Sequence, residues 1–122
     1  MVGQAGILTL AALAAGALSI TPALACKCEK LSRTQATARA DVAFEGRVVR
    51  VRVEGSQVYT EIETSRPLKG AVPRRVELGS RRSAAACGVM FREGQRLTFA
   101  ARFAEQQFTT NSCLMNAVNS RP

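Results

Sequence analysis

The sequence predicts a mainly β protein: a small closed barrel of five strands with one or two short helices and two disulfides. Three observations lead to this fold class. Apolar and polar residues alternate with a period of two in several short segments that are separated by turn signals. The first of these segments is long and changes phase near its middle. All four cysteines lie after residue 25.

Residues 1–25 have the layout of a secretory signal peptide. They contain no Asp, Glu, Lys or Arg, and the apolar run at 7–18 is followed by Pro22 and a small-x-small site that ends at Ala25. This order is typical of signal cleavage. The run is too short to predict a membrane span, which needs about 20 strongly apolar residues. We therefore expect residues 26–122 to form a single exported domain.

Cys26 would be the first residue of the mature chain, with its amine either free or blocked by a lipid. A bacterial lipoprotein also starts at a cysteine, but its pattern has Leu about three residues earlier. Here Ala23 occupies that position and Leu24 follows it. Ordinary cleavage with a free amine is therefore favoured, and we expect a secreted or cell-envelope protein. Lipid anchoring at Cys26 and an uncleaved N-terminal segment are the alternatives.

Four cysteines in a small exported domain indicate a disulfide framework, formed by Cys26, Cys28, Cys87 and Cys113. Four cysteines allow three pairings. A Cys26–Cys28 bond would close a strained ring, which disulfide geometry disfavours, so two schemes remain. The spacing does not indicate a zinc site, because the chain has no histidine and Cys-x-Cys with two distant cysteines is not a zinc-finger pattern.

A short helix is expected at 31–40, and a long bent strand is expected after it. Ser32 is placed to cap the helix, and Gln35 lies three residues on, the spacing of a capping box. From Val42 the apolar residues alternate, and their phase slips by one residue within 46–49. Because such a slip turns every side chain to the other face, we expect a β-bulge there.

Four further strands are expected along the chain. The second, at 58–64, is expected to break at 66–70, which contains a proline and a glycine. A short third strand covers 76–78, a fourth covers 97–103, and a fifth covers 108–113. Five strands of which the first is long and bent are typical of an OB-fold-like Greek-key barrel.

The residues do not predict catalysis. A chain without histidine has no Ser-His-Asp or Cys-His arrangement, and no Gly-rich phosphate loop is present. The carboxylates show no spacing that indicates an acid–base pair, and oxidised cysteines are not nucleophiles. We therefore expect that the protein is not an enzyme and carries no cofactor of its own.

The charge balance is strongly basic, with 17 Lys and Arg against 9 Asp and Glu and a net charge of +8. A basic exported domain suits an anionic polysaccharide, lipid headgroups or an acidic protein partner. Nucleic acid is not expected, because one Tyr and five Phe offer few rings for base stacking. A solvated strand face is the simpler interpretation. The arginines of the candidate basic surface occur in pairs: Arg50, Arg52, Arg74, Arg75, Arg81 and Arg82.

The cysteine pattern and its flanking residues resemble the tissue inhibitors of metalloproteinases and the related netrin-type modules. Cys26-Lys27-Cys28 is similar to their mature N-terminus, and residues 40–48 are similar to their first strand. Ala86-Cys87-Gly88 resembles the Cys-Gly step of their middle loop. Residues 97–100 and 108–113 resemble their closing strands and final cysteine. The resemblance spans nearly the whole of the expected mature chain.

This resemblance implies an OB-fold barrel in which Cys26 is bonded to Cys87 and Cys28 to Cys113. It also implies a mechanism, because in the inhibitors the amine and carbonyl of the first cysteine bind the catalytic zinc of a protease. That zinc belongs to the protease. The second residue enters the protease specificity pocket, and the middle loop flanks it. The corresponding candidate residues beside Cys26 are Lys27, Cys28, Ala85, Ala86 and Cys87.

Lys27 departs from the animal inhibitors, which have a small residue at this position. A charged side chain is costly to bury in an apolar pocket, so the resemblance implies a protease with an acidic pocket. Two other functions are compatible with the sequence. One is a non-enzymatic binding module that holds an anionic or cell-surface partner through the basic surface. The other is a small envelope protein without zinc chemistry.

Overall fold

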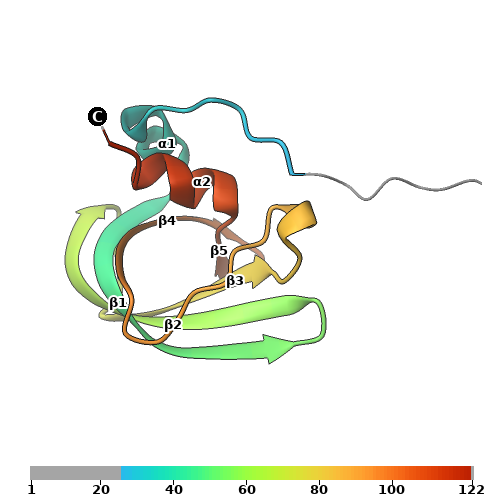
Figure 1. Ribbon diagram of the computed structural model, residues 1–122. Helices are drawn as coiled ribbons and strands as arrows, with labels where there is room; N and C mark the ends of the chain where they lie inside the picture. The colour runs from blue at the N-terminus through green and yellow to red at the C-terminus, as the bar shows by residue number, and fades with distance from the viewer. Residues whose placement is uncertain (1–25, 122) are drawn as a thin grey trace, which may run out of the picture.

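The computed structural model describes residues 26–121, and the predicted signal peptide lies outside these residues. The described part of the chain forms a closed five-stranded barrel with the strand order β1-β2-β3-β5-β4 (Figure 1). This is the OB-fold-like Greek-key barrel that the sequence predicts. None of the helices among these residues is long and apolar enough to cross a membrane.

Strands β1 (Val42–Glu54) and β2 (Gln57–Lys69) form a long antiparallel hairpin. Their pairing shifts register between Val48 and Arg50, so that Val49 is an extra residue on β1. Gly46 lies at the bend, where a Cβ atom would approach the Ile62 side chain to 2.7 Å. The bulge expected from the phase slip is confirmed, and it lets β1 pair with both β2 and β4.

The expected break of β2 at residues 66–70 is wrong, because the strand continues to Lys69. Pairing with β3 ends at Glu63, so the last part of β2 pairs with β1 alone. Register shifts in that part leave Ser65 and Leu68 without a partner on β1. A proline is tolerated at such a sheet edge between bulges, and Pro67 therefore does not end the strand.

Three further strands complete the barrel. β3 (Arg75–Arg81) pairs with β2, and β4 (Arg96–Ala104) pairs with the first half of β1. β5 (Gln107–Thr109) closes the barrel by pairing in parallel with β3 and antiparallel with β4. The predicted third and fourth strands are confirmed, with slightly wider bounds.

Two helices lie together beside β4 (Figure 1). In α1 (Arg33–Arg39), Ser32 and Gln35 form the predicted capping box. The fifth strand is shorter than predicted. It ends at Thr109, and α2 (Ser112–Val118) begins one residue before Cys113, where the strand was predicted to end. The Asn111 side chain accepts a hydrogen bond from the Leu114 amide at 2.9 Å and thereby starts this helix.

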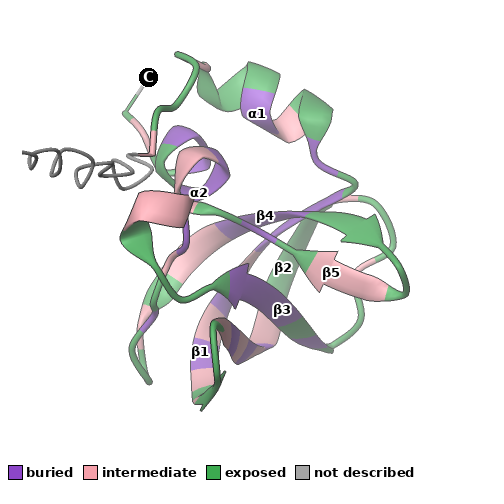
Figure 2. Cartoon of the chain, turned by 90° about the vertical axis from the view of Figure 1, so that its right-hand side faces the viewer, coloured by how far each residue is buried: buried purple, intermediate pink, exposed green. Residues whose placement is uncertain are grey.

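The apolar core has two parts. The barrel interior buries the inward-facing residues of β1 to β4 together with Phe91 and with Met115 of α2. A second, smaller cluster joins α1 and α2 to the outer face of β4 through Ala100. In Figure 2 buried residues line β3 and β4, whereas most of α1 is exposed. The helices are therefore held to the barrel by short side chains, mainly alanines.

Lys69 connects the end of β2 to the end of α1. Its Nζ atom donates hydrogen bonds to the carbonyl oxygens of Thr37, Ala38 and Ala40 at 2.9, 3.0 and 2.6 Å. A cation at a helix C-terminus satisfies carbonyls that have no partner within the helix.

We expect Lys69→Met to lower the free energy of unfolding by about 1 kcal/mol in a urea titration, because it removes this cation. Lys30→Met, at an exposed position, is the matched control, and an equal effect would contradict this role of Lys69.

Candidate functional site

The two disulfides join the N-terminal segment to two distant parts of the chain. Cys26 is bonded to Cys87, 61 residues away, and Cys28 is bonded to Cys113, 85 residues away. This is the pairing that the family resemblance implies. The segment therefore lies between the loop that follows β3 and the first turn of α2. We call Cys26–Cys28 together with Ala84–Cys87 the cysteine ridge.

The loop half of the ridge is a tight hydrogen-bonded turn. Ala84–Ala86 form one turn of 3-10 helix. The amides of Ala86 and Gly88 both donate to the Ser83 carbonyl, at 3.1 and 2.9 Å. Cys87 follows with a left-handed backbone (φ 62°), which is uncommon for a residue other than glycine. Its amide donates to the Ala84 carbonyl at 3.0 Å, so the turn and the disulfide together hold this conformation.

Helix α2 forms the base of the ridge. The amide of Ser112, the first residue of the helix, donates to the Cys87 carbonyl at 2.9 Å. The Ser112 hydroxyl lies 3.6 Å from Cys26 Sγ. Sequence reasoning does not identify this contact, because the sequence predicts a strand at this point. The Asn111 cap before a run of apolar residues is the signal that indicates the helix.

Gly88 allows the loop to pass close to the end of β3. A Cβ atom at this position would lie 2.0 Å from the Arg81 carbonyl oxygen and 2.8 Å from the Ser83 carbonyl oxygen. Both contacts are with backbone atoms, which cannot rotate away as a side chain can. Only glycine fits without displacing the ridge.

We expect Gly88→Ala to lower the free energy of unfolding by about 2 kcal/mol, the usual cost of overpacking. Urea unfolding followed by circular dichroism measures this change. Gly55→Asn is the matched control, because no atom approaches within 4 Å of a Cβ at that position and asparagine tolerates its left-handed backbone. Equal stability of the two variants would show that the close approach at Gly88 is not required.

The N-terminal half of the ridge is accessible to a partner. Lys27 and Cys28 are exposed, whereas Cys26 is partly buried. Ala85, Ala86 and Cys87 on the loop half are also partly buried. The disulfides therefore bring the residues implied by the resemblance to one part of the molecule, with Lys27 exposed to solvent.

The ridge is also anchored from its other side. Glu29 accepts two hydrogen bonds from the Arg39 guanidinium of α1, at 2.9 and 3.1 Å. These bonds hold the pKa of Glu29 below its usual value of 4.5. Because the pKa of Glu29 is lower in the folded chain, the pair stabilises the folded segment at a pH above the usual carboxyl pKa. This stabilisation is lost as the pH falls through the lowered pKa. The anchor therefore operates at neutral pH and weakens in acid.

The structure divides the candidate basic surface into two groups. Arg50 and Arg75 both pair with Glu61, and Arg52 pairs with Glu77 at 3.3 Å while its guanidinium lies over the Tyr59 ring. On the outer face of the hairpin these three arginines are therefore largely neutralised by glutamates. The remaining three make no ion pair within residues 26–121: Arg74, Arg81 and Arg82.

Two of these free arginines, Arg81 and Arg82, shortly precede the loop half of the ridge in the chain. The Arg81 carbonyl is the atom against which Gly88 packs, and the Arg82 amide donates to the Ser56 carbonyl at the tip of the β1–β2 hairpin. Both arginines are exposed. Lys27 is exposed as well, so all three cations are accessible to an anionic partner.

Comparison with known proteins adds no family name. The chain matches no protein-family model, and no curated protein matches it.

Proposed function

We propose that the protein is an exported inhibitor of a metalloprotease, which acts through the amine and carbonyl of Cys26 after cleavage behind Ala25. The observation that supports this most directly is the pair of bonds Cys26–Cys87 and Cys28–Cys113. They hold the first three residues of the expected mature chain against a rigid turn. A terminus held in this way can enter an active-site cleft without first being ordered.

The chemistry of binding is that of metal coordination. A catalytic zinc keeps one coordination position for water, and a neutral amine together with a carbonyl oxygen can replace that water. In the proposed complex the protease supplies the zinc, and Cys26 supplies both ligands. Two disulfides and the Glu29–Arg39 contact restrict the segment before binding, so little conformational entropy is lost on docking.

The charge of the ridge restricts the choice of protease. Lys27 would enter the specificity pocket, and an ammonium group is retained there only when a carboxylate pairs with it. Arg81 and Arg82 would face the rim of the cleft. We therefore expect the target to have an acidic pocket and an acidic rim.

The alternative function is binding to an anionic polymer or surface through the free arginines, and the absence of ion pairs at Arg74, Arg81 and Arg82 within residues 26–121 favours it. It predicts retention on a sulfated polysaccharide column that falls steeply with salt. This binding would not require a free amine at Cys26. The two functions therefore respond differently to one change at the N-terminus.

The test compares a chain that begins at Cys26 with one that retains Ala25. In the longer chain the Cys26 nitrogen is part of an amide and has no lone pair for zinc. We expect its inhibition constant against a zinc protease with an acidic specificity pocket to be at least about 100-fold weaker, since a metal contact is worth several kcal/mol.

Arg81→Gln with Arg82→Gln is the matched control for charge, and it should leave the effect of Ala25 intact. Equal inhibition by the two chains would contradict coordination by Cys26. If neither chain inhibits any protease of this class, and both bind the polysaccharide equally, the alternative function replaces the inhibitor.

A further inference from the structure

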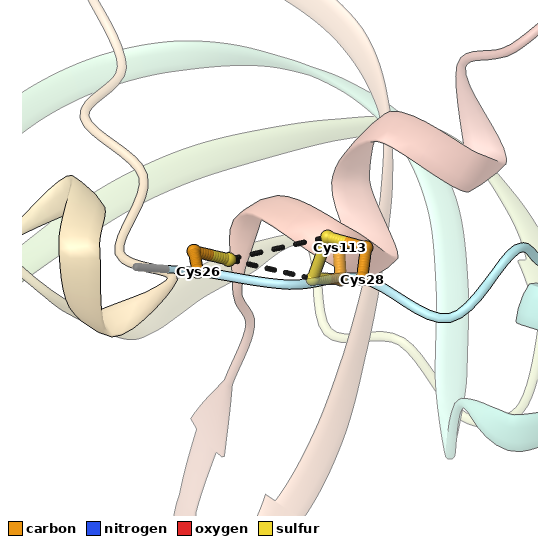
Figure 3. A group of neighbouring side chains, drawn as sticks. All are labelled: Cys26, Cys28 and Cys113. Atoms are coloured by element: carbon orange, nitrogen blue, oxygen red, sulfur yellow. Dashed lines mark hydrogen bonds between the residues drawn. A yellow bond between two sulfur atoms is a disulfide. The ribbon is translucent and has the colours of Figure 1, made fainter. Parts of the chain in front are cut away.

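The four cysteine sulfurs form one cluster beneath the ridge. Cys26 Sγ lies 3.7 Å from Cys113 Sγ and 4.0 Å from Cys28 Sγ, and Cys113 Sγ lies 3.8 Å from Cys87 Sγ. Figure 3 shows three of the four, with Cys26 beside the Cys28–Cys113 bond. Oxidised sulfurs carry no proton, so these distances are packing contacts between two neighbouring disulfides.

The spacing between the disulfides matches that of a metal site. Thiolate sulfurs bind Zn²⁺ at about 2.3 Å in a tetrahedron, and such a tetrahedron has edges of about 3.8 Å. Three contacts that run between the two disulfides already have nearly this length. When the S–S bonds are broken, the sulfurs of each pair can separate toward the same spacing by side-chain rotation.

We propose that reduction of both disulfides converts this cluster into a zinc site with four thiolate ligands, one each from Cys26, Cys28, Cys87 and Cys113. A dithiol reductant opens each disulfide by exchange and becomes a cyclic disulfide, while two cysteine thiols form. Four thiols then release four protons as they bind one Zn²⁺. This site is independent of the proposed inhibitory function.

The site would keep the ridge assembled under reducing conditions. Without S–S bonds, the N-terminal segment loses its covalent links to the loop and to α2. One zinc ion would join the same three segments again. The chain has no histidine to compete for the metal, and Lys27 lies next to two of the ligands, where its charge offsets that of the thiolates. The linear spacing of the cysteines does not indicate this site, because only the fold brings the four together.

Cobalt and zinc titrations test the proposal. The purified protein is reduced with a phosphine, which takes oxygen from water as each disulfide becomes two thiols, and is then titrated with Co²⁺ without oxygen. We expect thiolate-to-cobalt charge transfer and tetrahedral visible bands that saturate at one Co²⁺ per chain and disappear on addition of one Zn²⁺. The unreduced protein should show neither change.

Two controls distinguish a defined four-cysteine site from non-specific metal binding by individual thiols. In the reduced variant with Cys28→Ser and Cys113→Ser, we expect affinity for Co²⁺ to fall at least about 100-fold. Zinc should also raise the melting temperature of the reduced wild-type protein, and native mass spectrometry should show one zinc per monomer. Unchanged affinity in the variant, a melting temperature that zinc does not raise, or metal only in cross-linked dimers would each overturn the proposal.

Discussion

Replacing Cys28 and Cys113 together by serine is expected to lower the free energy of unfolding by about 4 kcal/mol. The bond spans 85 residues, and closing a loop of this length in the unfolded chain is worth about 4.5 kcal/mol in the chain-entropy model. Small domains have a total stability of only about 5–15 kcal/mol, so the variant should lie close to its unfolding threshold at room temperature. Urea denaturation at neutral pH measures the difference.

The other disulfide offers the matched comparison. Cys26–Cys87 spans 61 residues, so Cys26→Ser with Cys87→Ser should cost nearly the same free energy. If the first double variant loses less than about 1 kcal/mol, the Cys28–Cys113 bond does not restrict the unfolded chain as the model requires. Similar losses for both pairs would support a framework in which each bond is needed.

Phe99→Ala is expected to be the most destabilising single substitution in the barrel, at about 4 kcal/mol. Phe99 is fully buried, and its ring lies 5.4 Å from the ring of Phe44 and 5.4 Å from that of Phe91. Truncation removes both aromatic contacts and leaves a cavity where β1, β4 and the loop before β4 meet. The change is measured by urea denaturation or by the melting temperature.

Phe103→Ala tests whether the effect depends on burial. Phe103 is on the same strand but 51 % exposed, and its ring lies 4.9 Å from that of Phe108 at the barrel end. We expect a loss below about 1 kcal/mol for this variant. A comparable loss at both positions would mean that the interior of the barrel is not centred on Phe99.

The barrel could be predicted from the sequence because its strands carry a clear alternation. Val58, Thr60 and Ile62 alternate with polar residues and are all buried in β2. The phase slip before Val49 marks the bulge, because no single flat strand could bury both apolar sets. These signals are local, and each strand can be identified without knowledge of its neighbours.

The features that were predicted wrongly depend on tertiary contacts. Pro67 would end a strand that is paired with neighbouring strands on both sides. At this sheet edge β2 is paired with β1 alone, so the strand continues through the proline. Helix α2 is short, and its local signal, the Asn111 cap, comes only two residues after β5 ends. The arginines are a separate case: the ion pairs of Arg50, Arg52 and Arg75 form across strands, so the partners of these residues could not be assigned from the linear sequence.

The candidate site was predictable only in part. Reasoning from the residues left two disulfide pairings open, and the resemblance chose the one that the structure contains. The resemblance also indicated the position of the ridge. It did not indicate the contact of Ser112 with the loop, the need for glycine at 88, or the contacts among the four sulfurs, which arise only when distant segments fold together.

Intact-mass and peptide-mass analysis of the mature protein, collected from cells that export it, tests the central claim most directly. We predict a chain that begins at Cys26 with an unmodified amine, and non-reduced peptides that link Cys26 to Cys87 and Cys28 to Cys113. An acyl group on Cys26, a retained Ala25, or a Cys26–Cys113 link would contradict the proposal that this terminus is a preorganised zinc ligand.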